Sequence, residues 1–175
     1  MEVLVTERLI LRPISRQHCT FQYVTWLNDE RVYKFLDTRG GYSLEMLQKY
    51  IEKVIANDVL MWAIHLLEND KHIGNIKIDP INNELKTGEY GILMGERSEW
   101  GKGYAKEASE AVINYCFEEI GLRKISLGVV TDNEKAIRLY LGLGFQNERI
   151  LPGKVIYDGI SYDVLRMCKV NPKKV

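Results

Sequence analysis

The sequence predicts an α/β fold of the α+β kind, with a mixed, mostly antiparallel seven-stranded sheet and about four to five helices on its faces. Two observations carry this prediction. A strand–helix–strand unit over residues 89–130 requires a parallel pair, because a helical crossover returns the chain in the same direction. Short turns join the strands on both sides of this unit, and such turns make antiparallel hairpins. One parallel pair is therefore expected among antiparallel neighbours.

The length of the chain is that of one domain. Its 175 residues are enough to bury a hydrophobic core. The sequence contains no internal repeat, no low-complexity tract and no linker rich in proline, glycine and serine. We therefore expect a single domain over residues 6–170, followed by a short C-terminal tail at 171–175.

Composition excludes several classes of protein. The chain has 24 Lys+Arg and 24 Asp+Glu, so no overall field favours nucleic acid or an anionic membrane. We see no secretory signal and no apolar stretch of bilayer length, and therefore expect a cytoplasmic protein without nucleic-acid or membrane partners. The cysteines and histidines lack disulfide or zinc spacing, which predicts reduced thiols, no metal, and histidines at the surface or satisfied in the core. These residues are Cys19, Cys116, Cys168, His18, His65 and His72.

The N-terminal half should carry one strand, three helices and a hairpin. The first segment alternates apolar and polar residues and stops at a proline, which is typical of a short strand. Apolar residues then recur at helical spacing, with a break near Asn28–Asp29, so two short helices are predicted there. The expected elements are a strand at 8–13, helices within 16–36, a helix starting after Ser43 and ending near Ala56, and strands at 61–67 and 72–78.

The C-terminal half should alternate strands and helices and end in a hairpin. Small and apolar residues from Ala105 to Cys116 share one helical face, and Gly121 can close that helix. Asp158–Gly159 is suited to a tight turn between the last two strands. The expected elements are strands at 89–94 and 125–130, helices starting near 105 and spanning 133–143, and final strands at 145–156 and 162–170.

The first motif with chemical meaning is Trp100–Ala105, which lies between a predicted strand and a predicted helix. Its two glycines allow a tight turn with unobstructed backbone N–H groups, and the helix adds free donors and the positive end of its dipole. Such a turn can receive a phosphate or diphosphate, although a simple tight turn would need the same glycines. The motif lacks the third glycine of a dinucleotide fingerprint and the Gly-Lys-Ser/Thr of a P-loop.

The second motif spans Asn133–Phe145 on a predicted helix. Asn133 can cap the helix start, and Gly144 can adopt the left-handed conformation that stops it. Tyr140 follows Asn133 by seven residues, which is two turns along the same face. Its hydroxyl could face a ligand, and a core tyrosine is the alternative.

In this order and about thirty residues apart, the two motifs resemble those of the GNAT superfamily of N-acetyltransferases, in the branch of ribosomal-protein-alanine and amino-sugar N-acetyltransferases. Gly103 and Ala105 match the small positions of the loop that grips the CoA diphosphate in that family. Trp100 stands where Gln or Arg is usual, a departure typical of this branch. The likeness covers nearly the whole chain. The second motif is matched by Asn133, Ala136, Tyr140 and Gly144–Phe145.

The resemblance implies an enzyme that moves an acetyl group from acetyl-CoA, its cosubstrate, to a primary amine by direct attack, without a metal. It also implies a splayed central parallel pair. Tyr140 would protonate the leaving thiolate, and Glu89 is the candidate base, with a surface salt bridge or an ordered water as alternatives. Arg138 is a further basic candidate for the phosphates. The residues expected to bind acetyl-CoA are Ile92, Leu93, Met94, Gly101, Lys102, Gly103, Tyr104, Ala105, Lys106, Asn133, Lys135, Ala136 and Tyr140.

The acceptor implied by the resemblance is a small-molecule amine such as an amino sugar or a sugar nucleotide. Trp26, Asn28 and Arg39 are candidate acceptor residues, with core aromatic and surface arginine roles as alternatives. Three other functions stay open: acetylation of the N-terminus of a protein such as a ribosomal protein, acetylation of polyamines, and a non-catalytic acyl-CoA-binding module. Relatives often dimerise, and the C-terminal hairpin could serve as such a homodimer contact.

Overall fold

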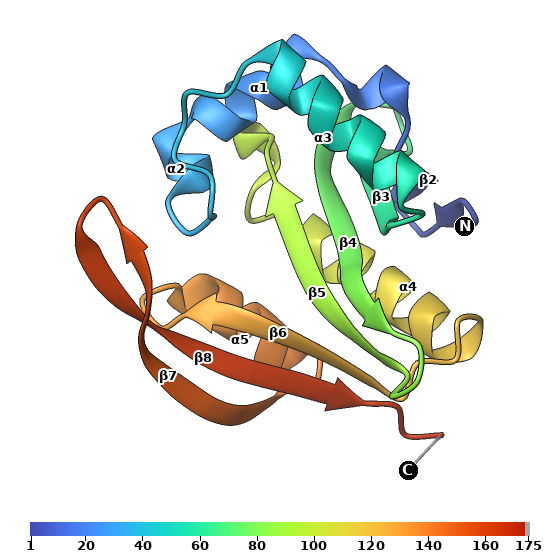
Figure 1. The fold of residues 1–175 in the computed structure, drawn as a ribbon. Coiled ribbons are helices and arrows are strands. Elements are labelled where there is room, and N and C mark those ends of the chain that lie inside the picture. Colours follow the sequence, from blue (N-terminus) through green and yellow to red (C-terminus); the bar gives the residue numbers. More distant parts are fainter. Residues whose placement is uncertain (174–175) are drawn as a thin grey trace. The chain divides into compact units, whose positions relative to one another are not determined.

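The computed structural model describes residues 1–173, which form one open sheet of eight strands in the order β1-β2-β3-β4-β5-β6-β8-β7 (Figure 1). The strands are β1 (Leu4–Val5), β2 (Leu9–Pro13), β3 (Leu60–Leu66), β4 (His72–Asn82), β5 (Thr87–Met94), β6 (Lys124–Val130), β7 (Gln146–Tyr157) and β8 (Ile160–Val170). The helices are η1 (Arg16–His18), α1 (Phe21–Asn28), α2 (Glu30–Tyr33), α3 (Leu44–Ala56), η2 (Arg97–Glu99), α4 (Tyr104–Glu118) and α5 (Glu134–Gly142).

The chain divides into two compact units. The first unit consists of Met1–Asp79 and Gly91–Val112. The second consists of Pro80–Tyr90 and the chain from Ile113 onward. Strands β4 and β5 and helix α4 contribute residues to both units.

The first unit is an antiparallel meander with helices packed on it. Strand β2 pairs with β1 and with β3, and β3 pairs with β4, all antiparallel. Helices α1, α2 and α3 each start at a side-chain cap, since Thr20, Asp29 and Ser43 accept hydrogen bonds from their backbone N–H groups. The apolar faces of α1 and α3 meet the sheet in one core. Its buried members are Ile14, Tyr23, Trp26, Leu27, Leu47, Ile51, Val54, Met61 and Ala63.

The second unit contains the parallel pair. Strand β6 pairs antiparallel with β8, which forms a hairpin with β7 through a turn at Asp158–Gly159. Strands β5 and β6 are parallel, with Thr87–Glu89 opposite Lys124–Ser126. The strands themselves run on to Met94 and Val130, so the paired register covers only their first few residues.

The predicted fold class and element order are confirmed, with the sheet larger than expected. The eighth strand is β1, whose two residues are too few to give a periodic signal. The predicted break in the helical region 16–36 falls at Asp29, which ends α1 and caps α2. In the expected tail at 171–175, Asn171 is buried and its amide donates to the carbonyl oxygens of Phe117 and Leu122. Residues 174 and 175 of that tail lie outside the described residues.

The three histidines form a cluster within the first unit, which their sequence spacing did not indicate. The rings of His65 and His72 stack with centroids 4.9 Å apart, and His18 lies 5.4 Å from each of them. Burial, together with the neighbouring histidines, lowers the pKa of His72 to about 4. His18 and His65 are buried, so two of the three are core histidines, although the buried Nε2 of His65 lacks a hydrogen-bond partner within residues 1–173 and the expectation of satisfied core histidines fails there. Among the described residues, no group of His, Cys, Asp and Glu could hold a metal ion.

Candidate active site

In the first unit, the turn before α4 has the geometry of an anion-binding loop. Gly101 and Gly103 take φ angles of 79° and 87°, the left-handed region that glycine occupies without steric cost. Helix α4 then begins at Tyr104, and the N–H groups of Lys106 and Glu107 bond to the carbonyl of Gly103. The N–H groups ahead of these have no carbonyl one turn earlier to bond to. They therefore remain as donors at the positive end of the helix dipole.

The lysines of this turn are held by acidic side chains. Glu99 in η2 is 8% exposed, and its carboxylate receives Lys102 Nζ at 2.7 Å and Lys71 Nζ at 3.3 Å. The hydrogen bond from Lys102 lowers the pKa of Glu99, and Glu99 raises the pKa of Lys102 in return. Lys106 Nζ lies 3.8 Å from Glu110. Lys102 thus stays charged beside the turn while its ammonium is tied to Glu99.

The C-terminal end of β5, Ile92–Met94, is half-buried and tightly seated in the first unit. The indole N–H of Trp100 donates to the carbonyl of Met94 at 2.9 Å. A Cβ on Gly95 would lie 2.0 Å from the Trp26 ring, and a Cβ on Gly74 would lie 2.3 Å from the Leu93 carbonyl oxygen. Only glycine fits at either position, and the close contacts fix the backbone of this strand end.

In the second unit, α5 holds the phenol that the second motif singled out. Tyr140 is 8% exposed, with the rings of Tyr90 and Phe145 centred 5.6 Å and 6.0 Å from its own. Burial raises the pKa of Tyr140 to about 12, because desolvation disfavours the phenolate. The side chain therefore stays protonated at neutral pH and can act as a proton donor.

Both predicted ends of α5 are confirmed. The Asn133 side chain accepts a hydrogen bond from the N–H of Ala136 at 3.3 Å, which caps the helix start. Gly144 has φ 85° and ends the helix, and the N–H of Phe145 bonds to the Tyr140 carbonyl. Both basic candidates on this helix, Lys135 and Arg138, are exposed, and Arg138 Nη1 lies 3.2 Å from Glu134 Oε2.

Glu89 forms a salt bridge, which the sequence left open as an alternative to its role as base, with a partner that the sequence did not indicate. Arg166 on β8 donates to both carboxylate oxygens of Glu89 on β5, at 2.5 Å and 2.8 Å, and this raises the pKa of Arg166. Strand β6 lies between them, and Gly128 is the β6 residue in register with Arg166. A Cβ on Gly128 would lie 3.2 Å from the guanidinium, so the glycine leaves room for Arg166 to reach across. A glycine inside a strand was the available signal.

The three candidate acceptor residues all have structural contacts in the first unit. Trp26 is 4% exposed, so it is a core aromatic residue. The Asn28 amide donates to the carbonyl of Tyr42 and accepts from its N–H, which ties α1 to the loop before α3. Arg39 donates to the carbonyls of Tyr33 and Lys34 and lies over the Tyr33 ring. Their part in acceptor recognition stays a prediction.

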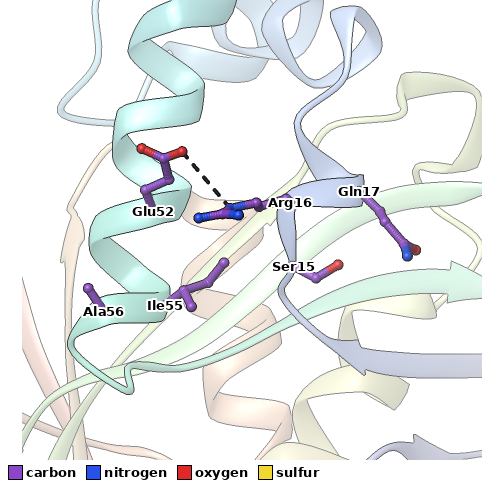
Figure 2. A pocket seen from close by; sticks show the side chains of 6 residues that line it. All are labelled: Ser15, Arg16, Gln17, Glu52, Ile55 and Ala56. Carbon is purple, nitrogen blue, oxygen red and sulfur yellow. Dashed lines mark ion pairs between the residues drawn. The ribbon is translucent and has the colours of Figure 1, made fainter.

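The first unit also has a surface depression of about 620 Å³, which Figure 2 shows from close by. Arg16 and Glu52 face each other across it, with Arg16 Nε 4.0 Å from Glu52 Oε1 (Figure 2). It is lined by η1 and α3, and by none of the residues of the two motifs. The lining residues are Ser15, Arg16, Gln17, Glu52, Ile55 and Ala56.

Comparisons with known proteins identify the family. The model of the acetyltransferase (GNAT) domain family matches residues 8–146, so the chain belongs to this family and acetyl transfer to an amine is its class of reaction. The predicted resemblance is thereby confirmed.

Individual relatives agree with this assignment. The chain is 30% identical to an uncharacterized N-acetyltransferase, YoaA, of Bacillus subtilis, over 98% of each chain. It is 33% identical to a spermidine N(1)-acetyltransferase of Escherichia coli, over 90% of this chain and 83% of the relative. A solved spermidine N-acetyltransferase from Vibrio cholerae, in complex with CoA and spermine, superposes with a TM-score of 0.87, at 25% identity and covering 97% and 98% of the two chains. Among the residues that the structure describes, no helix has the length and apolar character needed to cross a membrane.

Proposed function

We propose that the chain uses acetyl-CoA as its acetyl donor and binds the CoA diphosphate at the turn Gly101–Lys106. The observation that carries this proposal is the pair of left-handed glycines ahead of α4. A Cβ on Gly101 would meet no atom within 4 Å, so this side of the turn is open to an anion. Backbone N–H groups and the helix dipole supply the attraction, and no buried positive charge is needed.

The reaction requires three groups of the chain: a donor that holds the thioester oxygen, an acid for the leaving thiolate and a base for the amine. The amine nitrogen attacks the thioester carbonyl carbon, and a backbone N–H of Ile92–Met94 holds the carbonyl oxygen as it gains charge. The carbon–sulfur bond then breaks, and the Tyr140 hydroxyl gives its proton to the departing thiolate. The second proton that the amine nitrogen loses on becoming an amide restores the Tyr140 hydroxyl by way of water. A phenol suits this task, because it is still protonated at neutral pH. The acetyl group passes directly to the amine, so no covalent enzyme intermediate forms.

The attacking amine must also lose a proton. An alkylammonium has a pKa near 10, so an acceptor is required at neutral pH. We assign this role to Glu89 acting through a water molecule. Both of its carboxylate oxygens accept hydrogen bonds from Arg166, which orients the group and leaves its second lone pairs for water.

For the acceptor, we propose a polyamine. Two spermidine acetyltransferases are among the similar proteins, one of them 33% identical over 90% of this chain. An amino sugar or sugar nucleotide is the second candidate, and it would need groups other than Trp26, Asn28 and Arg39, which are engaged in the core and in backbone contacts. A protein N-terminus is the third.

A thiol-release screen tests the proposed function. Purified protein is mixed with acetyl-CoA and, in separate reactions, with spermidine, spermine, glucosamine, an amino sugar nucleotide and an N-terminal alanyl peptide. We expect the highest kcat/KM with a polyamine, and mass spectrometry should find one acetylated amine per thiol released. A preference for the amino sugars would move the acceptor to the second candidate. Binding of acetyl-CoA without thiol release with any amine would instead favour a non-catalytic acyl-CoA-binding module.

A further inference from the structure

A single arginine from the N-terminal segment contacts the glycine turn directly. Arg8 immediately precedes β2, and its Nη1 donates to the carbonyl of Lys102 at 2.9 Å. Its guanidinium carbon lies 4.6 Å from the centre of the Tyr104 ring. A Cβ on Gly103 would lie 3.4 Å from Arg8 Nη2. The guanidinium thus contacts Lys102 and Tyr104, fills the space that a side chain at position 103 would enter, and covers one side of the turn.

The same arginine is fixed from behind by the first turn of α4. Arg8 Nε and Nη2 lie 2.8 Å and 2.7 Å from Glu107 Oε2, and the backbone N–H of Arg8 donates to Glu107 Oε1. The Thr6 hydroxyl donates to Glu107 Oε1 at 2.6 Å. Burial opposes ionisation of Glu107, but the hydrogen bonds from Thr6 and Arg8 outweigh it, and the pKa of Glu107 is lowered. One carboxylate therefore ties the N-terminal segment, Arg8 and the helix start together.

A turn with two glycines needs such support. Glycine has the most conformational freedom of any residue. In an unsupported turn, part of the free energy of ligand binding would therefore be used to order the backbone. Because the peptide is planar and trans, holding the Lys102 carbonyl on one side directs the Gly103 N–H to the other side. The backbone is then set before the diphosphate arrives.

We propose that Arg8 is a positioning residue for the CoA diphosphate: together with Glu107 it holds the Gly101–Ala105 turn in its binding conformation without contacting the cosubstrate. The inference rests on the proposed acetyl-CoA site. It predicts that Arg8 matters only for donors that carry the diphosphate. A bridge that merely joins β2 to α4 would affect every donor equally.

The test compares two acetyl donors with one amine. Acetyl-CoA carries the diphosphate, whereas S-acetylpantetheine has the same thioester without it. We expect Arg8→Gln to lower kcat/KM for acetyl-CoA about tenfold, through KM, and to change kcat/KM for S-acetylpantetheine less than about twofold. Arg8→Lys should show most of the same loss in kcat/KM for acetyl-CoA. Lysine keeps the charge but lacks the fork that joins Lys102 to Glu107. Arg12→Gln, in β2 and paired with Asp70, is the matched control and should resemble the unsubstituted protein with both donors.

The outcomes separate this inference from the proposed function. Equal losses with both donors, or no loss with either, would overturn the positioning role. Thermal unfolding of each variant identifies general damage, and Arg8→Lys provides the second variant if Arg8→Gln unfolds. If the unsubstituted protein shows no turnover at all, the proposed acetyl transfer is contradicted. The role of Arg8 can then still be tested by calorimetry, which compares the effect of Arg8→Gln on the binding of CoA and of pantetheine. A protein that binds neither compound would contradict both proposals.

Discussion

The two regions that carry the proposed chemistry are held in opposite ways. The glycine turn of the first unit is supported by ionic contacts near the surface, with the Arg8 side chain 44% exposed and that of its partner Glu107 16% exposed. Tyr140 in the second unit is 8% exposed and surrounded by aromatic rings. Backbone N–H donors need an open side where an anion can enter, whereas burial disfavours the phenolate and widens the pH range over which the phenol stays protonated. If the proposed roles hold, ionic contacts shape the binding turn, whereas desolvation keeps the proposed acid protonated.

The largest effect is expected at the buried side of this comparison. Tyr140→Phe removes the hydroxyl and keeps the ring, so packing in the second unit should survive. Loss of a general acid costs on the order of 100-fold in rate, and we expect kcat to fall by about that factor with KM for acetyl-CoA unchanged. Steady-state kinetics measure both values. Tyr162→Phe, elsewhere in the second unit, is the matched hydroxyl deletion and should keep kcat within about twofold; unchanged turnover in Tyr140→Phe would reject the proton-donor role.

The next effect concerns the exposed turn. Gly103→Ala places a side chain at φ 87°, which costs roughly 1–2 kcal/mol, and puts a Cβ 3.4 Å from the Arg8 guanidinium. We expect KM for acetyl-CoA to rise about tenfold while kcat changes little, because the turn binds the donor and takes no part in proton transfer. Gly121→Ala carries similar strain at the end of α4, with φ 78°, and is the control. The Tm of both variants should fall. If KM for acetyl-CoA also rises in Gly121→Ala, backbone strain alone explains the effect of Gly103→Ala.

A smaller effect is expected at the ion pair of the second unit. Arg166→Gln removes the fork that orients Glu89, and we expect kcat to fall about threefold, or about 0.7 kcal/mol, which lies within the range found for partly exposed ion pairs. The pair of Lys124 and Glu148 lies in the same unit with similar exposure, so Lys124→Gln is a matched control with no expected change in kcat. Equal kcat values in the two variants would contradict the role of Glu89 as base, and its ion pair with Arg166 would then be structural only.

The smallest expected effect is an absence of change. Burial raises the pKa of Tyr140 to about 12 from the ordinary value of 10, so the protonated form is retained up to the raised value and lost only as the pH passes it. With an amine acceptor held at saturation, kcat should therefore stay level from pH 8 to about pH 10. An acid of ordinary pKa would already have lost half its protonated form at the upper limit. A decline of kcat with a midpoint near 10, absent in Tyr140→Phe, would show that water reaches the phenol and that burial does not tune it.

The sequence predicted most of the fold because the periodic signals were strong and local. Ser43, Asn133 and Gly144 mark helix ends by their own capping chemistry, and each lies where expected. What could not be predicted depends on contacts between distant residues. His18 and His65 share one core although 47 positions separate them, and Arg8 meets Glu107 only because β2 lies beside the start of α4. Contacts between residues so far apart in the sequence cannot be predicted from the spacing of residue types.

The candidate site likewise has parts that follow from local sequence signals and parts that depend on contacts between distant residues. The glycine turn and the capped helix of Tyr140 follow from short motifs, so the order of residues along the chain is enough to identify them. The partner of Glu89 could not be identified in this way, since Arg166 reaches it across β6 only where Gly128 leaves space. The acceptor residues were the weakest prediction, because a buried tryptophan and a solvent-facing one look the same in a sequence.

The most direct test of the account is a single-turnover experiment with acetyl-CoA labelled in its acetyl group. Protein in excess over the labelled donor is mixed with spermidine, quenched at intervals, and separated into protein, amine and CoA fractions. Direct attack predicts that the label passes from acetyl-CoA to the amine while free thiol appears at the same rate, with none retained on the protein. Label that accumulates on the protein before reaching the amine, or that never leaves acetyl-CoA with any amine offered, would contradict it.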